Sequence, residues 1–289
     1  MAQEYGGDVL RFLYGNPAGR LLLKYVAAAP WFSKCRAVSQ RSGRSKKRIA
    51  PFVDTYGIDL TDGGYGSGWA VDDFASFNDF FTRKRDYEDY FADLARAGRL
   101  AGPGELPAVA DASLSVCPIR EGLRVAVKET TYSLEELTGG PVSDRYEGGH
   151  CLLFRLGLTD YHRYLFPDRG KVLARRDLPG ALHTVRPISE EYRVYSRNKR
   201  RVTVLDTEQF GELTMIEVGA MLVGHIVDHP LPDDRFEAFT EKGYFEFGGS
   251  TIVLLTGPEL EIDDRFRSAG AEDNEVHVRM GEPIGRNKH

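Results

Sequence analysis

Cysteine is scarce in this sequence, with three among 289 residues, and none of them stands in a C-x-x-C pair or at a metal-ligand spacing. A disulfide framework and a cysteine-ligated zinc site are therefore not predicted. We expect Cys35, Cys117 and Cys151 to act as small buried hydrophobic side chains in a reducing compartment. The sequence predicts no metal site of any other kind.

Long apolar segments are also missing. No uninterrupted stretch approaches the ~20 residues that a membrane-spanning helix needs, and the start, MAQEYGGDVL, lacks the basic and apolar regions of a secretory signal. The sequence has no G-x-x-x-x-G-K-[ST] motif, no G-x-G-x-x-G element between a strand and a helix, and no internal repeat. We therefore expect neither a bilayer-spanning protein nor nucleotide chemistry.

Charge is unevenly distributed, although the total is only −5. Residues 1–50 carry ten basic side chains and two acidic ones, a net of +8, which leaves −13 for residues 51–289. The same region mixes these cations with aliphatic and aromatic residues, which suits a helix lying on an anionic membrane surface. The alternative is a helical cap that packs its apolar face on the main domain. The acidic remainder argues against binding to nucleic acid.

Helical patterns dominate the first hundred residues. Residues 8–15 and 18–29 are predicted helices separated by a Gly-Asn-Pro break. Residues 45–56 form a third, and a fourth helix or a pair of helices begins at a Ser76 cap. The stretch AGRLAGPGELPAVAD, rich in glycine and proline, then marks a change of character. The sequence thus predicts a helical N-terminal region over residues 1–100.

From about residue 107 the pattern becomes one of short strands. The predicted strand segments are PAVADASLSV, LRVAVKE, GHCLLFRLG, RVTVLDT, GELTMIEVGAMLVGHIV, YFEFGGSTIVLLTG and VHVRMGEPIG. Many short strands with glycine-rich turns indicate a closed or sandwiched β unit. The predicted fold class is therefore α+β, with the helical region packed on a β-rich, barrel- or sandwich-like domain over residues 101–289.

The stretch GYFEFGGSTIVLL places Gly248, Gly249, Ser250 and Thr251 between two runs that resemble strands. Glycine weakens a strand interior, because it adds backbone entropy to the unfolded chain and offers no side chain to pack. One interpretation is a hairpin turn or a bulge. The other is that the backbone itself reacts, since a hydroxyl directly after glycine can attack the unhindered glycine carbonyl.

Three further segments could carry chemistry. Asp111, in VADAS, ends a short apolar run, where an aspartate is ordinarily a turn residue. His162 lies among aromatic residues in LTDYHRYLFPDRG, and an imidazole can act as a base near neutral pH. FNDFFTRK, residues 77–84, is an aromatic helix face that ends in cations. With Ser250, these segments supply a hydroxyl, an imidazole and a carboxylate, the set of nucleophile, base and orienting group.

Five segments resemble the phosphatidylserine decarboxylase family in order and in spacing. They are FNDFFTRK, DYHRYLFP, GELTMIEVGAMLVGHI, KGYFEFGGSTIVLL and VRMGEPIG. The resemblance runs from about residue 8 to residue 285. Its most specific parts are the glycine–serine element with its flanking aromatic residues and the F-x-x-F-F-x-R segment.

The resemblance implies a proenzyme that cuts itself. Ser250 would attack the carbonyl of Gly249 and convert the peptide bond to an ester. β-Elimination would then separate a β chain, residues 1–249, from an α chain, residues 250–289. Hydrolysis with loss of ammonia would leave a pyruvoyl group at the N-terminus of the α chain.

The resemblance also implies roles in the decarboxylation. His162, oriented by Asp111, would be the base that activates Ser250, and it is also the candidate for the later proton transfer. The covalent pyruvoyl group would condense with the substrate amine to a Schiff base and accept the electrons that CO₂ leaves behind. Phosphatidylserine would become phosphatidylethanolamine, and no metal, pyridoxal phosphate or nucleotide is required.

The sequence departs from the family pattern at three positions. A second histidine usually follows the first within Y-H-R-x-H, but Leu165 occupies that position here. The carboxylate segment usually reads Asp-Gly, but Ala112 follows Asp111. His225 replaces a small hydroxyl residue of the V-G-A-x-x-V-G-S-I pattern. One hypothesis is that His225 is an accessory residue that supplies the imidazole Leu165 lacks, and the other is that it caps a strand on the surface.

Three functions are open at this point. The first is a phosphatidylserine decarboxylase proenzyme, peripheral to the cytoplasmic side of the cell membrane, with its α and β chains associated and, as the resemblance implies, a homodimer. The second is a related pyruvoyl-dependent decarboxylase of a soluble, for example aromatic, amino acid, with Leu165 reshaping the pocket. The third is an unprocessed pseudoenzyme that binds lipid. The basic N-terminal region favours the first over the second, and the intact Ser250, His162 and Asp111 favour an enzyme over the third.

Overall fold

The computed structural model describes most of the chain beyond residue 38. The described residues are 12–13, 15–16, 39–61, 65, 68–127, 130–183, 193–219, 225–247, 250–267 and 275–288. The helices predicted at 8–15 and 18–29 fall wholly or largely outside these residues, and so do Cys35 and Gly249.

Helices come first in the described chain. They are η2 (Gly43–Arg48), α4 (Ile49–Tyr56), η4 (Val71–Asp73), α5 (Phe77–Phe81) and α6 (Tyr87–Arg96). The helix predicted at 45–56 corresponds to the end of η2 and the whole of α4. The Ser76 cap is confirmed, because its hydroxyl accepts the Asp79 N–H at 3.1 Å. Asp86 caps α6 in the same way, so the aromatic segment forms a pair of helices.

The largest of the three sheets in the described chain has the order β11-β7-β8-β9-β13-β5-β2-β3-β4, with β15 beside β2. Its strands are β2 (Ala112–Arg120), β3 (Arg124–Val127), β4 (Thr130–Ser133), β5 (His150–Leu156), β7 (Gly170–Leu178), β8 (Arg200–Thr207), β9 (Gly211–Gly219), β11 (Arg235–Phe236), β13 (Ser250–Thr256) and β15 (Val276–Val278). Neighbouring strands are antiparallel throughout.

Two smaller antiparallel sheets complete the strands. One has the order β1-β16-β14 and the other β10-β12-β6. Their strands are β1 (Glu105–Pro107), β6 (Arg163–Leu165), β10 (Ile226–Asp228), β12 (Glu241–Phe245), β14 (Leu260–Ile262) and β16 (Pro283–Asn287). Short helices lie between strands: α7 (Leu134–Thr138), η5 (Asp144–Tyr146), α8 (Val194–Arg197), η7 (Pro232–Asp234) and α9 (Asp264–Arg267).

The strands on either side of the glycine–serine element belong to different sheets. β12 pairs with β10 and β6, whereas β13 pairs with β9 and β5 in the middle of the large sheet. The hairpin interpretation of this stretch is therefore wrong. Gly243 is needed within β12, because a Cβ there would lie 2.1 Å from the carbonyl oxygen of Val227.

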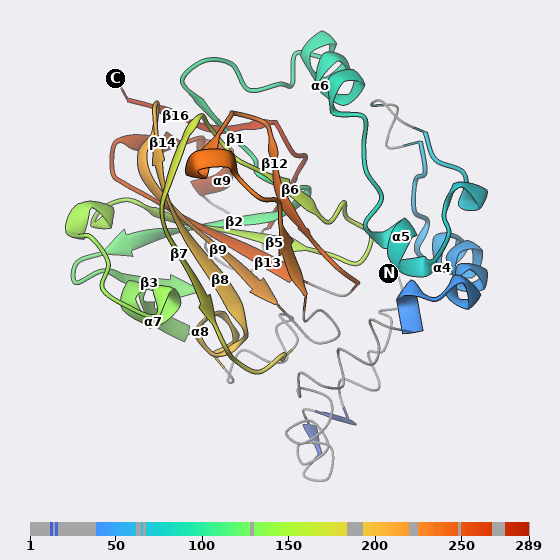
Figure 1. Ribbon diagram of the computed structural model, residues 1–289. Coiled ribbons are helices and arrows are strands. Elements are labelled where there is room, and N and C mark those ends of the chain that lie inside the picture. Colours follow the sequence, from blue (N-terminus) through green and yellow to red (C-terminus); the bar gives the residue numbers. More distant parts are fainter. Residues whose placement is uncertain are drawn as a thin grey trace.

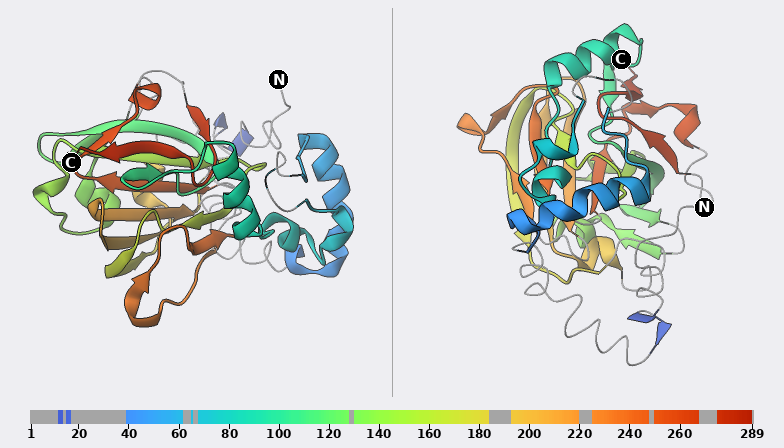
Figure 2. Two further views of the ribbon diagram at one scale, coloured as in Figure 1. Left: turned by 90° about the horizontal axis from the view of Figure 1, so that it is seen from above. Right: turned by 90° about the vertical axis from the view of Figure 1, so that its right-hand side faces the viewer.

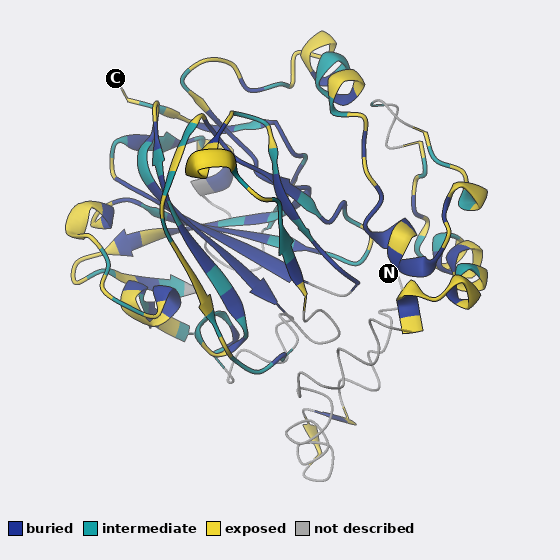
Figure 3. Cartoon of the chain, viewed as in Figure 1, coloured by how far each residue is buried: buried dark blue, intermediate teal, exposed yellow. Residues whose placement is uncertain are grey.

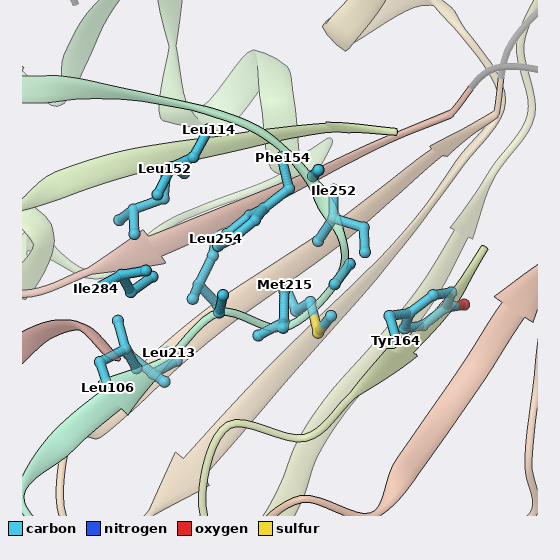
Figure 4. Close-up of a cluster of buried hydrophobic side chains, with 14 of the residues drawn as sticks. Leu106, Leu114, Leu152, Phe154, Tyr164, Leu213, Met215, Ile252, Leu254 and Ile284 are labelled. Carbon is cyan, nitrogen blue, oxygen red and sulfur yellow. The ribbon is translucent and has the colours of Figure 1, made fainter. Parts of the chain in front are cut away.

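The main hydrophobic core fills the space between the large sheet and the two small ones (Figure 4). Side chains alternate along β13, so Ile252 and Leu254 point into this core while Val253 and Leu255 face the other side of the sheet. On that second face, a smaller core lies under α7, and it includes the buried Cys117 and Cys151. The prediction that these two cysteines are buried is confirmed.

The helices α4 and α5 lie together at one side of the strands, as Figures 1 and 2 show from three directions. Their inward faces are buried and their outward faces exposed (Figure 3). Phe52 of α4 and Phe77 and Phe80 of α5 form an aromatic cluster that also includes Phe247, just after β12. The chain is therefore an α+β protein with helices packed against antiparallel sheets, which confirms the predicted fold class.

Candidate active site

Ser250 begins β13 and is completely buried. It lies opposite Gly219 of β9 and Leu156 of β5, and the alternation of β13 places its side chain on the side of Ile252, toward the main core. Its Oγ has no hydrogen-bond partner among the described residues. A buried hydroxyl without a partner is costly in an ordinary core, so this atom is a candidate for chemistry.

The chain turns directly after β5, which ends at Leu156, the residue paired with Ser250 in the sheet. His162 follows this turn. The turn is closed by the side chain of Asp160, which accepts the Gly157 N–H at 2.7 Å. The Nδ1 of His162 lies 2.8 Å from the carbonyl oxygen of Asp160. A carbonyl can only accept, so Nδ1 carries the proton and Nε2 is the basic nitrogen of the neutral ring. The His162 ring is fully buried, and its centroid lies 4.1 Å from the centroid of the Phe81 ring.

Asp111 directly precedes β2 and is buried with Arg85. Its carboxylate accepts from Nη1 and Nη2 of Arg85 at 3.1 and 2.5 Å, and from the Met280 N–H at 2.9 Å. Burial works to raise the pKa of Asp111, but the guanidinium and the N–H outweigh it and hold the pKa below its usual range. Arg85 lies between the rings of Tyr90 and Tyr161, 4.3 and 4.0 Å from their centroids. Asp111 is therefore an ionised carboxylate.

The structure gives His162 and Asp111 different hydrogen-bond partners from those expected of an orienting pair. The carbonyl of Asp160 accepts a hydrogen bond from Nδ1 of His162, while the carboxylate of Asp111 accepts from Arg85 and from the Met280 N–H. The Asp160 carbonyl thus fixes the tautomer of His162 in which Nε2 can accept a proton. The predicted orienting role of Asp111 stays a prediction.

Two of the three positions that depart from the family pattern, Leu165 and His225, lie in different surroundings. Leu165 is fully buried in an apolar cluster with Tyr90, Leu94, Tyr161 and Met280. The side chain of His225 is 57% exposed, with Nδ1 3.4 Å from Glu246. The accessory role predicted for His225 stays a prediction, and its exposed position agrees better with the surface alternative.

A group of buried charges lies on the same face of the sheet as Ser250. Glu217 of β9 is opposite Ile252, so it is a diagonal neighbour of Ser250 with about 7–8 Å between Cα atoms. Lys242 of β12 lies 2.8 Å from Glu217 and 3.0 Å from Asp228. Burial raises the pKa of Glu217 to about 7, although Lys242 opposes the shift. This cluster joins the large sheet to the small β10-β12-β6 sheet near Ser250.

We expect Lys242→Met, made in an uncleaved Ser250→Ala chain, to lower the free energy of unfolding by about 3–5 kcal/mol at pH 8, because it leaves the buried Glu217 without its cation, whereas Asp228 keeps Arg201 at 3.3 Å. The loss in the free energy of unfolding becomes smaller at pH 6. The pKa of Glu217 is raised on folding. The contribution of Glu217 to the stability of the fold is therefore present below its unfolded pKa and is lost as the pH rises through about 7. Urea unfolding at the two pH values measures both effects.

The matched control is Lys171→Met, which removes an exposed lysine 3.5 Å from Asp206. We expect it to change the stability by less than about 0.5 kcal/mol at either pH. The double variant Lys242→Met/Glu217→Gln recovers part of the loss, since one uncompensated carboxylate is gone. Equal stability of Lys242→Met and Lys171→Met would show that the buried cluster carries no electrostatic function.

A cavity of about 210 Å³ lies elsewhere, under α7 and η5. Tyr146, Arg176 and Thr214 are among its lining residues, and Thr214 pairs with Leu255 of β13. It is therefore on the second face of the large sheet, away from the Ser250 side chain. Among the described residues there is no cluster of histidine, cysteine or carboxylate that could hold a metal, and no helix long and apolar enough to cross a membrane.

Sequence reasoning missed Arg85, Asp160 and the Lys242 cluster. Asp160 stands inside the LTDYHRYLFPDRG segment, and Arg85 stands two residues after the arginine of F-x-x-F-F-x-R, so both were close to a recognised motif. Lys242 and Glu217 also lie in quoted segments, but only the pairing of β9 with β13 and the contact between β12 and β9 bring them near Ser250. No local pattern could have revealed that contact.

Comparison with known proteins matches residues 77–286 to the family model described as phosphatidylserine decarboxylase. The chain is similar to phosphatidylserine decarboxylase proenzyme 2 of Clostridium acetobutylicum, with 39% identity over 98% of this chain and 93% of the relative. It is similar to the phosphatidylserine decarboxylase proenzymes of Clostridium perfringens, at 33% identity over 98% and 94% of the two chains, and of Chlamydia pneumoniae, at 35% over 96% and 90%. The relatives are thus matched over nearly their whole length, and the chain belongs to the phosphatidylserine decarboxylase family of carboxy-lyases.

Proposed function

We propose that this chain is a phosphatidylserine decarboxylase proenzyme that cuts itself between Gly249 and Ser250. The observation that carries the proposal is the buried Ser250 Oγ, which has no hydrogen-bond partner among the described residues and begins a central strand next to the turn that carries His162. The names of the relatives support the substrate and the proenzyme state.

Self-cleavage begins with proton transfer from Ser250 to Nε2 of His162. The Ser250 oxygen attacks the Gly249 carbonyl, so that a C–O ester bond forms and the C–N peptide bond breaks, and the proton passes to the Ser250 nitrogen. Loss of the Ser250 Cα proton then breaks the ester, which releases Gly249 as a carboxylate and leaves dehydroalanine. One water hydrolyses the derived imine, so that ammonia leaves and a ketone is formed.

The residues around Ser250 fit a pyruvoyl group. A pyruvoyl group formed from Ser250 would replace a hydroxyl that makes no hydrogen bond in the described chain, so the conversion would cost no existing hydrogen bond. The pyruvoyl group supplies an electrophilic carbonyl that acts as an electron sink when CO₂ is lost. Leu156 and Ile252 exclude water on the same face, while His162 is the group that holds or delivers a proton.

The α and β chains are expected to stay together after cleavage. β13 of the α chain pairs along its whole length with β5 and also with β9, while β15 and β16 pair with β2 and β1. The two chains should therefore elute as one species in size-exclusion chromatography and separate only in denaturant. Elution of a free α chain in native buffer would contradict this expectation.

The experiment that tests the proposal is mass spectrometry of the purified protein, followed by an activity assay. We expect the masses of residues 1–249 and 250–289, the second with a blocked N-terminus that borohydride reduces. The protein should release CO₂ from vesicles that contain phosphatidylserine, and not from free serine or aromatic amino acids. A single full-length mass would instead indicate the lipid-binding pseudoenzyme, and activity on a free amino acid would indicate the soluble-substrate enzyme.

Three further parts of the proposal rest on sequence. The cations of residues 1–50 suit an anionic membrane surface, and we place the enzyme peripherally on the cytoplasmic side of the membrane. The division into a helical region, 1–100, and a catalytic domain, 101–289, and the homodimer are also proposals. The order of described elements, with helices alone before β1 and strands with short helices between them after it, supports the division into two regions.

A further inference from the structure

Glu246 directly follows β12, four residues before Ser250, and its carboxylate is held by the helical region. Nη2 of Arg41 lies 2.7 Å from each of its two oxygens, and Nε of Arg41 donates to one of them at 3.2 Å. Asn78 of α5 donates to the same carboxylate at 3.5 Å. Glu246 is buried, while the side chain of Arg41 is half-exposed. A forked guanidinium fixes the direction of a carboxylate as well as its place.

Phe247 is held by the same helix. Its ring makes edge contacts at 5.0 Å with the rings of Phe77 and Phe81. Phe81 lies in turn 4.1 Å from the ring of His162. One side chain of α5 therefore touches both the segment that leads to the predicted cleavage site and the predicted base.

α5 itself is anchored at both ends. Nε of Arg163 donates to the carbonyls of Thr82 and Arg83 at 2.9 and 3.0 Å, a cation at the negative end of the helix next to His162. At the other end, the hydroxyl of Ser45 accepts the Phe77 N–H at 2.9 Å. The helix thus has little freedom to move relative to the base.

We propose that Arg41, Asn78, Phe81, Glu246 and Phe247 form a positioning bracket that sets the peptide upstream of Ser250 against His162 for self-cleavage. The inference rests on the proposed function. It makes the helical N-terminal region part of the self-processing machinery and gives the F-x-x-F-F-x-R segment a role beyond packing. The attack needs the hydroxyl and the carbonyl in near-attack geometry, and a displacement of about 1 Å can cost 10²-fold in rate.

The bracket is tested by timing self-cleavage of freshly synthesised full-length chains on denaturing gels. We expect Arg41→Ala and Glu246→Gln each to slow the conversion about tenfold, which corresponds to ~1.4 kcal/mol. The double variant should be no more than about twofold slower than either single variant, because both remove one interaction. Arg41→Lys, which keeps the charge and loses the fork, should be intermediate. Once cleaved, each variant should have a kcat within about twofold of the parent enzyme.

The matched control is Lys46→Ala, which removes another half-exposed cation of the helical region, 3.5 Å from Asp72, and should cleave at the parent rate. Melting of each variant in a Ser250→Ala background separates positioning from loss of fold. A parent rate for Arg41→Ala, additive losses in the double variant, or a fall in melting temperature that accounts for the slowing would each overturn the bracket. A parent chain that never cleaves would instead refute the proposed function, and the bracket with it.

Discussion

A single uncleaved chain is the expected product when Ser250 is replaced by alanine, with no species that borohydride can reduce and no release of CO₂ from phosphatidylserine. The reason is chemical, since alanine has no oxygen to attack the Gly249 carbonyl and cannot become a ketone. The loss should therefore be complete within detection, more than about 10³-fold in cleavage rate. The fold should persist, because the Ser250 hydroxyl makes no hydrogen bond among the described residues.

The matched control is Thr251→Ala, which removes the next hydroxyl along the chain. Thr251 is also buried, and its Oγ also has no hydrogen-bond partner in the described part of the chain. Alternation along β13 turns it to the second face of the sheet, with Val253. We expect this variant to cleave within about twofold of the parent rate. Cleavage of Ser250→Ala, or loss of cleavage in Thr251→Ala alone, would place the nucleophile elsewhere.

Local sequence chemistry predicted the elements that depend on local contacts. Ser76 caps α5 because its hydroxyl meets an N–H only three residues away. The strands with strong apolar content, such as β5 and β13, were also predicted correctly. β7 was missed, because GKVLARRDL is rich in cations and buries no residue completely on either face.

The pairing of the strands could not be read from the sequence. β12 and β13 stand five residues apart, and their spacing suggested a hairpin, yet each joins a different sheet. The preference is set by distant partners: β13 is buried on both faces between β9 and β5, and its residues 252–255 are an uninterrupted apolar run. Such choices depend on tertiary packing that a local pattern does not contain.

The sequence named candidate site residues, whose roles stay predictions, but it did not predict their contacts. The residues Ser250, His162 and Asp111 came from motifs and from the family resemblance. The partner of Asp111 is Arg85, from a different segment, and no spacing rule connects the two. The same holds for the link between Arg41 and Glu246, which are separated by 205 positions.

Replacement of His162 by glutamine should slow self-cleavage by about 10²–10⁴-fold, the usual contribution of a general base. Glutamine keeps a polar side chain of similar reach but cannot take up the Ser250 proton near neutral pH. The uncleaved chain should accumulate on denaturing gels and convert slowly over hours. The matched control is His229→Gln, which replaces a partly exposed imidazole bound to Glu241, and it should cleave within about twofold of the parent rate.

Two further substitutions decide which imidazole serves Ser250. Leu165→His restores the second histidine of the family pattern, but its side chain would enter an apolar cluster with Tyr161 and Met280. We expect it not to rescue His162→Gln, because the basic nitrogen of His162 is positioned by the Asp160 carbonyl and by Phe81. Full rescue would assign the base to position 165. His225→Ser should leave cleavage within about twofold, whereas a loss as large as that of His162→Gln would make the exposed His225 the base.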